Sequence, residues 1–299
     1  MERLPIRTIT FLISWVFVIG LILPGYGQSL EDLLSKESEP EINYATATFK
    51  ATRIINGHSI ERMEKRQLEF RISHRFGEVS RGSYNLYGLD MSTIHFSLEY
   101  GIADWLEIGA GRSSFEKTVD GFAKFSILRQ SSGAKKMPIH LSYVVSTEVN
   151  GLKWSDPTVT NYFSSRVSYV HQLLIARKFN DSFSMEINPT FVHRNLVKEA
   201  IEPNDLYALG VGARYKITKR TSLNAEYYYV YRRNAKYLDT KYYNPLSVGI
   251  DIETGGHVFQ IMLTNCGAMR EAGFIGKTTG NWLDKDFRLG FNISRTFSL

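Results

Sequence analysis

The chain has 299 residues, of which 43% are hydrophobic, 22% charged and 13% aromatic. This composition excludes a disordered polymer, and the aromatic share favours β-strands. The single cysteine, Cys266, excludes an internal disulfide framework and a cysteine-based zinc site. The net charge of +6 is small and scattered along the chain, so we expect no nucleic-acid partner.

The first 27 residues have the layout of a secretory signal peptide. Arg3 and Arg7 precede an apolar run over 9–23, and small residues follow at Gly25 and Gly27. A membrane-spanning helix needs about 20 apolar residues, and this run is shorter. We therefore expect residues 1–27 to be removed by cleavage near Gly27/Gln28. The residue after the predicted cleavage point is Gln28 and not a cysteine, so we expect no lipoprotein.

Residues 28–66 come before the first clear strand and form an N-terminal segment. Residues 29–34 have the composition of a short helix, and 45–60 are rich in small side chains with an Asn56-Gly57 pair. Small side chains suit a plug inside a barrel, but a strap in the periplasm would have the same composition. Of these two alternatives we prefer the strap.

Apolar and polar side chains alternate along most of the chain after residue 66. In 68–76, for example, Leu68, Phe70 and Ile72 are separated by charged or hydroxyl-bearing neighbours. Such alternation is typical of strands that have one apolar and one polar face. It predicts about twelve strands, at 68–76, 91–100, 105–113, 119–128, 139–148, 163–178, 183–191, 206–216, 222–232, 245–253, 257–265 and from 287 onward.

The strand lengths and the connections favour a barrel in a membrane. A strand tilted across a bilayer needs about 9–11 residues, whereas strands of soluble proteins are usually about five or six residues long. Short turns at 101–104, 180–182, 218–221 and 254–256 alternate with long polar loops at 77–90, 150–162, 195–205, 232–244 and 265–284. The predicted fold is therefore all-β: an antiparallel up-and-down transmembrane β-barrel over residues 67–299.

Aromatic residues gather near both ends of the predicted strands, which is typical of the two girdles of a membrane barrel. Those near the short turns are Tyr100, Trp105, Phe179, Phe183 and Phe297, and those near the long loops are Tyr162, Phe163, Tyr231, Tyr242 and Tyr243. The last strand ends Arg295-Thr296-Phe297-Ser298-Leu299 and resembles the C-terminal assembly signal of such barrels, with the usual terminal aromatic displaced.

The alternation also predicts which charged side chains face the lumen. The positive candidates are Arg71, Arg75, Lys124, Arg166, Arg214, Lys216 and Arg288, and the negative ones are Glu69, Glu99, Glu107, Glu148, Glu186, Glu226, Asp251 and Glu253. Nearly balanced charges in a barrel of this size have two interpretations. They make an ion-paired polar interior, or they line a narrow pore for small polar solutes.

Two His-x-Ser pairs, His95/Ser97 and His140/Ser142, place both side chains on one face of a strand. A serine activated by a histidine is the arrangement of many hydrolases, including outer-membrane phospholipases. Both pairs are predicted to face the lumen, away from lipid. His74 and His171 are predicted to face outward. No metal spacing, P-loop or dinucleotide fingerprint is present, so we expect no cofactor and no metal.

Several short strings resemble an uncharacterised family of outer-membrane β-barrels, a domain of unknown function in the Bacteroidota. These strings are Ala47–Lys50 with Ile55–His58, Ile72–Phe76, His171–Phe179, Val192–Asn195, Asp251–His257 and Asn292–Arg295. The resemblance covers nearly the whole chain after the signal peptide. It implies an outer-membrane barrel and implies no catalytic or binding residues.

Three functions follow from these features as hypotheses. The first is a narrow channel or transport accessory for small polar solutes in the outer membrane. The second is a non-conducting membrane scaffold that docks periplasmic or surface partners. The third, a lipid hydrolase, rests only on the His-x-Ser pairs, and the protein is otherwise expected not to be an enzyme. The expected partners are outer-membrane lipid and the machinery that assembles barrels.

Overall fold

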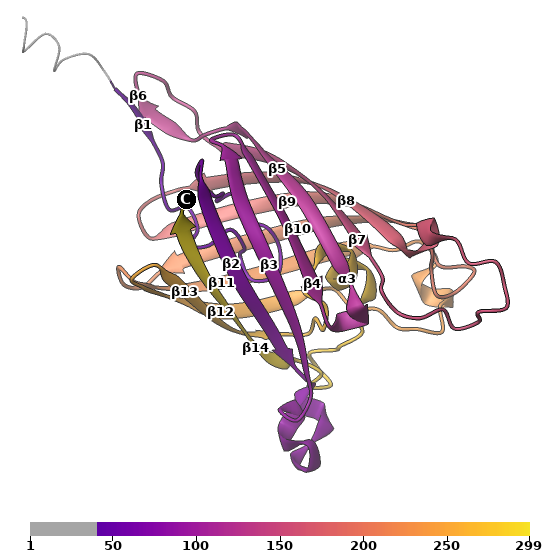
Figure 1. Ribbon diagram of the computed structural model, residues 1–299. Coiled ribbons are helices and arrows are strands. Elements are labelled where there is room, and N and C mark those ends of the chain that lie inside the picture. Colours follow the sequence, from indigo (N-terminus) through magenta and orange to yellow (C-terminus); the bar gives the residue numbers. More distant parts are fainter. Residues whose placement is uncertain (1–40) are drawn as a thin grey trace, which may run out of the picture. The chain divides into compact units, whose positions relative to one another are not determined.

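The computed structural model describes residues 41–299, so the expectations for the signal peptide, its cleavage site and the helix at 29–34 lie outside the described residues. Twelve strands form a closed barrel (Figure 1). They are β2 (Gln67–Phe76), β3 (Ser92–Ala103), β4 (Leu106–Ser113), β5 (Val119–Leu128), β7 (His140–Val149), β8 (Val167–Lys178), β9 (Phe183–Arg194), β10 (Asp205–Lys216), β11 (Thr221–Tyr231), β12 (Leu246–Thr254), β13 (His257–Thr264) and β14 (Arg288–Ser298).

Each barrel strand pairs antiparallel with the next one along the chain, and β14 pairs with β2 to close the ring. The predicted all-β, twelve-stranded antiparallel barrel is confirmed. Two short strands, β1 (Ile42–Tyr44) and β6 (Ser131–Gly133), pair with each other outside the ring and were not predicted. Among residues 41–299, no helix is both long and apolar enough to cross a membrane.

The connections give the barrel two different ends. The short-turn end carries the links at 104–105, 179–182, 217–220 and 255–256, together with the β6 link. The long-loop end carries the 3-10 helices η1 (Val79–Arg81), η2 (Ser83–Gly88), η3 (Phe115–Lys117), η4 (Phe163–Arg166) and η5 (Ala235–Tyr237), and the helix α3 (Glu271–Lys277). Residues 163–166 were predicted to begin a strand, but they form η4, and β8 begins at Val167.

Alternate side chains of each strand face outward and into the lumen. On β9, Ile187 is 39% exposed on the outer face, whereas its neighbour Asn188 is 1% exposed on the inner face. On the adjacent β10, Leu209 is likewise exposed and Gly210 is buried. The outer face is therefore apolar at the middle of the strands, as a surface in contact with lipid must be.

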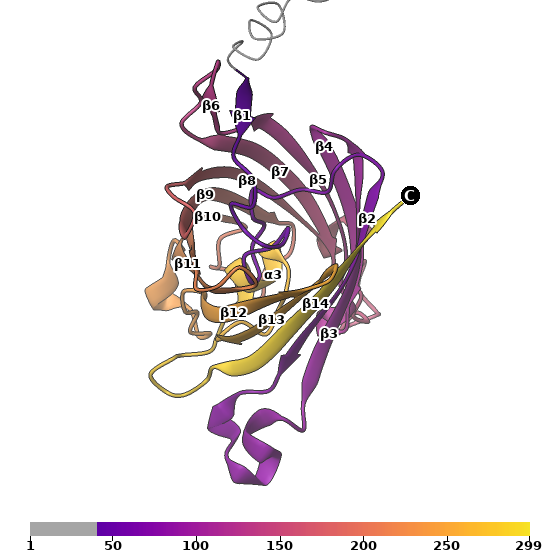
Figure 2. The same ribbon diagram turned by 90° about the vertical axis from the view of Figure 1, so that its left-hand side faces the viewer.

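Two chain segments fill the lumen, so the barrel is not an open cylinder. Looking along the ring, Figure 2 shows the N-terminal segment and α3 inside it. Residues 51–60 are all buried, and the first six residues of α3 are buried as well. The expectation of an external strap is therefore wrong for residues 51–60, which lie inside the barrel, whereas Thr46 and Ala47 are exposed.

Candidate functional site: a lumen closed by two segments

A tight hairpin at the tip of the N-terminal segment reaches into the middle of the lumen; we call residues 52–59 the N-terminal hairpin. The amide of Ile54 donates to the Gly57 carbonyl at 2.9 Å, and Ser59 donates to Thr52 at 2.9 Å. A Cβ atom at position 57 would lie 2.0 Å from the Tyr228 hydroxyl oxygen, so only glycine fits.

The Glu226 carboxylate on β11 holds the turn of this hairpin. It accepts the backbone N–H groups of Ile55, Asn56 and Gly57 at 3.2, 2.8 and 3.1 Å, and the Asn56 side-chain amide at 2.8 Å. Hydrogen bonds to an ionised group are stronger than those between neutral groups. The carboxylate therefore replaces the water that would otherwise solvate three buried backbone donors.

Apolar contacts also fix the same segment against strands of the wall. The buried cluster contains Phe49, Ile54, Ile55 and Ile60 from the segment, and Phe122, Val144, Leu174, Ala176 and Met262 from the strands. Each of these wall residues occupies a lumen-facing position of its strand. These apolar wall residues were not predicted, because only charged lumen-facing side chains were considered. Apolar residues at inward positions of the strands indicate that an apolar segment lies opposite them.

The loop between β13 and β14 folds back into the other half of the lumen, where it forms α3. The Glu148 carboxylate of β7 accepts the amide of Ala272 at 2.6 Å. Phe274 packs edge-on against Tyr228, with the ring centroids 5.1 Å apart. Val170, Val192 and Leu206 from the wall complete this second apolar cluster. This stretch was predicted as a long polar loop, and its inward course was not predicted.

The two segments meet near the centre of the barrel. Arg53 of the N-terminal hairpin forms an ion pair with Glu271 of α3, and both side chains are almost completely buried. The Arg53 guanidinium also lies 3.8 Å from the Glu99 carboxylate on β3. The contact therefore links a segment that enters at the short-turn end with a loop that enters at the long-loop end.

Most of the charged residues predicted to face the lumen contact the N-terminal segment. Arg71 donates to the Thr52 hydroxyl at 2.6 Å, Arg75 to the Asn56 side chain at 2.9 Å, and Lys124 to the Glu61 carbonyl at 2.7 Å. Glu99 accepts from the Thr52 hydroxyl at 2.6 Å, Arg214 donates to the Ala47 carbonyl at 2.6 Å, and Glu253 pairs with Lys50. The inward charges therefore bind the N-terminal segment, and Arg71 and Lys124 also form ion pairs with the wall carboxylates Glu69 and Glu107.

Six candidates make no hydrogen bond or ion pair with the described part of that segment, residues 41–66. Two of them are Glu148, which accepts from α3, and Lys216 at the end of β10. Asp251 accepts from Gln260 at 3.0 Å, and both oxygens of Glu186 are buried without a hydrogen-bond partner. Arg288 pairs with Glu78 at 2.6 Å near the long-loop end. Arg166 lies in η4 rather than on a spanning strand, which corrects the expectation that it faces the lumen from a strand.

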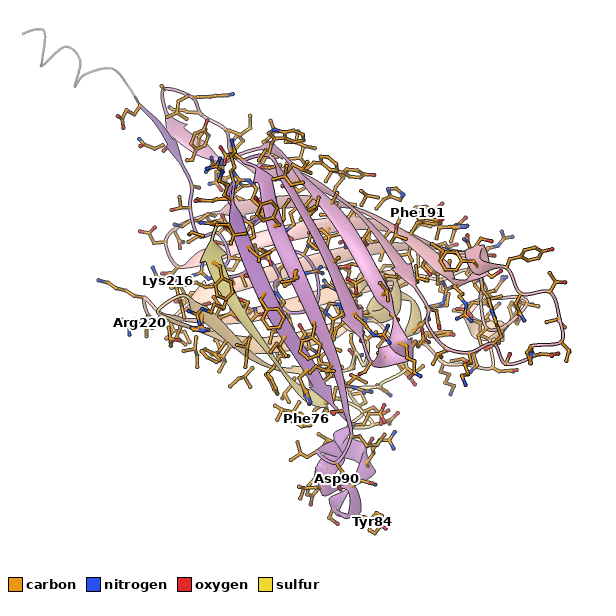
Figure 3. All side chains as sticks on the ribbon, in the orientation of Figure 1. Phe76, Tyr84, Asp90, Phe191, Lys216 and Arg220 are labelled. Atoms are coloured by element: carbon orange, nitrogen blue, oxygen red, sulfur yellow. The ribbon has the colours of Figure 1, made fainter. Side chains whose placement is uncertain are left out.

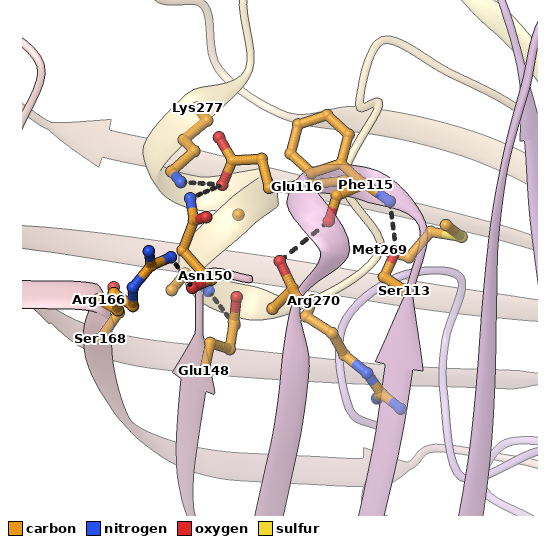
Figure 4. Close-up of a pocket in the computed structure, with 14 residues that line it drawn as sticks. Ser113, Phe115, Glu116, Glu148, Asn150, Arg166, Ser168, Met269, Arg270 and Lys277 are labelled. Carbon is orange, nitrogen blue, oxygen red and sulfur yellow. Dashed lines mark hydrogen bonds and ion pairs between the residues drawn. The ribbon is translucent and has the colours of Figure 1, made fainter. Parts of the chain in front are cut away.

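Arg166 instead helps line a polar cavity at the long-loop end, shown in Figure 4. Its guanidinium donates to the Asn150 carbonyl at 2.9 Å and stacks on Trp154 at 3.9 Å. The Asn150 side chain donates to Glu116 at 3.0 Å, and Lys277 of α3 pairs with the same carboxylate. These contacts tie α3 to the rim of the barrel.

Two neighbouring long loops are also tied to each other. Glu199, in the β9–β10 loop, accepts the amides of Asp239 and Thr240 from the β11–β12 loop at 2.8 and 2.9 Å. These backbone donors favour the ionised carboxylate, and they hold the pKa of Glu199 below its usual value.

Neither His-x-Ser pair has the geometry of an activated nucleophile. His95 contacts Asp120 at 2.7 Å, and His140 contacts the Thr48 hydroxyl at 3.3 Å. Within residues 41–299, no hydrogen bond joins either histidine to the serine of its pair, and the Ser97 hydroxyl has no partner. No group of three His, Cys, Asp or Glu side chains in this range is arranged to hold a metal ion.

The sequence of residues 49–297 matches the family described as a membrane-bound beta-barrel domain, DUF5777. The chain belongs to this family. The match covers the whole barrel and the N-terminal hairpin, so the hairpin lies within the family domain. No curated protein matches the chain.

Several solved barrels are similar to this chain at low sequence identity. The NanC porin is 9% identical over 78% of this chain and 100% of its own, with a TM-score of 0.47. The KdgM porin is 9% identical over 77% and 99%, also at 0.47. An outer membrane channel from Pseudomonas putida F1 is 11% identical over 79% and 97%, at 0.47. These TM-scores are too low to support an argument about the fold. The barrel is established by the pairing of its own strands.

Proposed function

We propose that the protein is an outer-membrane barrel that acts as a gated narrow channel for small polar solutes, and that this structure is its closed state. The observation that carries the proposal is the way Glu226 holds the N-terminal hairpin. Three of its four hydrogen bonds go to backbone donors, and water or a polar solute replaces such bonds when the hairpin leaves.

The wall behind the hairpin suits a polar solute. Withdrawal of the hairpin would leave Arg71, Arg75, Glu99 and Glu226 without their present partners on the segment. Charges of both signs in a narrow lumen favour small, uncharged or zwitterionic polar molecules over ions of one sign. In outer-membrane barrels the short turns face the periplasm, so the hairpin enters the lumen from the periplasmic side.

Opening requires both segments to move. The Arg53–Glu271 ion pair joins the hairpin to α3, so displacing one segment leaves a buried charge on the other. The two closures are therefore coupled, and a signal at either end of the barrel would reach the other through this contact.

Planar-bilayer recording of two matched glycine variants tests the channel. Gly57→Ala places a Cβ atom 2.0 Å from the Tyr228 hydroxyl and should expel the hairpin, whereas the added Cβ of Gly121→Ala meets its nearest atom at 3.6 Å. We expect rare, brief openings from the unchanged protein and from Gly121→Ala, and frequent openings from Gly57→Ala. If Gly57→Ala exposes both its hairpin and α3 to protease and remains silent in the bilayer, the channel proposal fails.

A non-conducting scaffold is the second candidate, favoured by the two apolar clusters that fix both segments against the wall. Such packing suits a permanently closed barrel that displays its loops and its N-terminal residues to partners. The bilayer experiment separates the two candidates, since only the channel gains conductance when the hairpin is displaced.

A further inference from the structure

A groove crosses the outer face of the barrel over β7–β10, on the surface that faces the hydrocarbon of the membrane. Its sides are formed by Tyr143, His171, Leu173, Pro189, Phe191 and Tyr207. Figure 3 shows Phe191 projecting away from the wall. The groove faces lipid and not the lumen, so nothing in the proposed channel function accounts for it.

The hydrogen-bonded ladder between β8 and β9 lapses at this groove. Pairing runs as far as Gln172 with Thr190 and resumes at Ile175 with Ile187, leaving two residues of each strand unpaired. Elsewhere the outer wall of a membrane barrel must satisfy its backbone groups within the sheet, because lipid offers them no hydrogen bonds. The lapse therefore occurs where it is energetically most costly.

Pro189 is the cause of the lapse. Counting along the register from the last pair places Pro189 opposite Leu173. Proline has no N–H, so the ladder cannot supply a donor to the Leu173 carbonyl oxygen. Proline in sheets is normally confined to edges and bulges, and a closed barrel has no edge. The groove thus contains a backbone acceptor without its donor at hydrocarbon depth.

A polar pair of side chains lies beside this carbonyl on the same lipid-facing surface. The Tyr143 hydroxyl and the His171 Nδ1 atom are 2.6 Å apart. The His171 ring stacks between Tyr143 and Phe191, with centroid distances of 6.1 and 6.2 Å. If Tyr143 donates to Nδ1, the other ring nitrogen carries the proton and donates outward. An ionisable side chain that faces hydrocarbon is costly and marks a functional position.

We propose that this groove binds a lipid-soluble molecule that carries a hydroxyl group on an apolar body and enters from the membrane. Its hydroxyl donates to the Leu173 carbonyl and accepts from the His171 ring, and its apolar body lies along Phe191 and Tyr207. A hydrocarbon chain of an ordinary lipid fills the same space but leaves the carbonyl and the imidazole unsatisfied. The open acceptor therefore selects for a donor group.

Photolabelling in phospholipid vesicles tests the site directly. The probes are a sixteen-carbon alcohol and the matching alkane, each with a diazirine at the far end of the chain, and the labelled residues are mapped by mass spectrometry. We expect the alcohol to label the groove about fivefold more than the alkane, the ratio given by one net hydrogen bond. Excess unlabelled hexadecanol should suppress this labelling.

Two groove variants and one control complete the experiment. Pro189→Ala restores the missing N–H, and His171→Phe keeps the ring but removes the hydrogen bond, so each should lower the preference for the alcohol. Ile261→Ala, on the outer face of β13, should leave the preference unchanged. Equal labelling by the two probes would show that the groove binds any lipid acyl chain. Crosslinked dimers would show that a second copy of this protein occupies the groove. Either result overturns the proposal. So would a preference that survives both groove variants.

Discussion

Arg53 and Glu271 are 218 residues apart in the sequence, yet they form a buried ion pair at the centre of the barrel. One belongs to the N-terminal hairpin and the other to α3. Neither residue lies on a barrel strand, so the contact depends on two segments entering the lumen from opposite ends. The closure of the barrel is therefore a tertiary interaction between inserted segments rather than a property of the wall.

Replacing one partner of this pair should destabilise the closed lumen strongly. Arg53→Met leaves the Glu271 carboxylate buried without its cation, and the loss of one partner of a buried pair typically costs about 3–5 kcal/mol. We expect the backbone amides of α3 to exchange with solvent much faster in this variant. The double variant Arg53→Met/Glu271→Leu should recover much of the protection, because the Glu271 carboxylate is removed together with its partner. Additive effects would show that the pair is not coupled.

Glu226→Gln should loosen the turn of the hairpin. The glutamine side chain has one neutral acceptor oxygen, whereas the Glu226 carboxylate now accepts from three backbone amides of the hairpin. A hydrogen bond to a charged group contributes about 1.5–3 kcal/mol. Losing one such contribution corresponds to at least about tenfold faster amide exchange at Ile55, Asn56 and Gly57. Asp251→Asn is the matched control, since Asp251 accepts from Gln260 and not from the hairpin amides. Unchanged exchange at the hairpin would contradict the role assigned to Glu226.

Arginine on the outer face should be tolerated at the rim but not at mid-strand. Ile250 and Ile102 are exposed on that face to similar extents, at 42% and 43%, in the middle of β12 and near the short-turn end of β3. Ile250→Arg should lower the free energy of unfolding in vesicles by about 2–4 kcal/mol, and Ile102→Arg by about 0–1 kcal/mol. Equal losses at both positions would argue against a bilayer around the strands.

The tie between the two long loops should weaken in acid. The pKa of Glu199 is lowered in the folded protein by the amides of Thr240 and Asp239. A lowered carboxyl pKa stabilises the fold above the ordinary glutamate value of about 4.3, and this contribution is lost as the pH falls through the folded pKa. We expect the amide exchange of Thr240, corrected for the intrinsic effect of pH, to lose protection over that range. Glu199→Gln should remove this pH dependence.

The placement of two residues shows where local pattern is sufficient. Ile187 and Asn188 are neighbours on β9, and the alternation alone assigns the first to the outer face and the second to the lumen, as found. This works because side chains of a strand alternate strictly between two faces that meet different surroundings. The number of strands, their antiparallel order and the polar or apolar character of most positions follow from the same rule.

The lumen could not be predicted in this way. Whether residues 45–60 lie outside or inside depends on contacts with Glu226, Tyr228 and Asn292, which come from strands far along the chain. The inward course of the β13–β14 loop depends likewise on Glu148 and on the apolar residues of the opposite wall. A local pattern carries no information about which distant side chains will surround a segment.

The alternation of side chains is enough to predict the barrel, because a strand that borders lipid on one face must repeat every two residues. The same alternation predicts most of the charged side chains that face the lumen. Arg166 is an exception, because it lies in η4 and not on a strand. The folded chain was needed to show that these charges hold a hairpin and that α3 meets it through the Arg53–Glu271 ion pair. Only the structure placed the Leu173 carbonyl opposite Pro189. These outcomes depend on the register of strands across a closed ring, and register emerges only when all the strands pair.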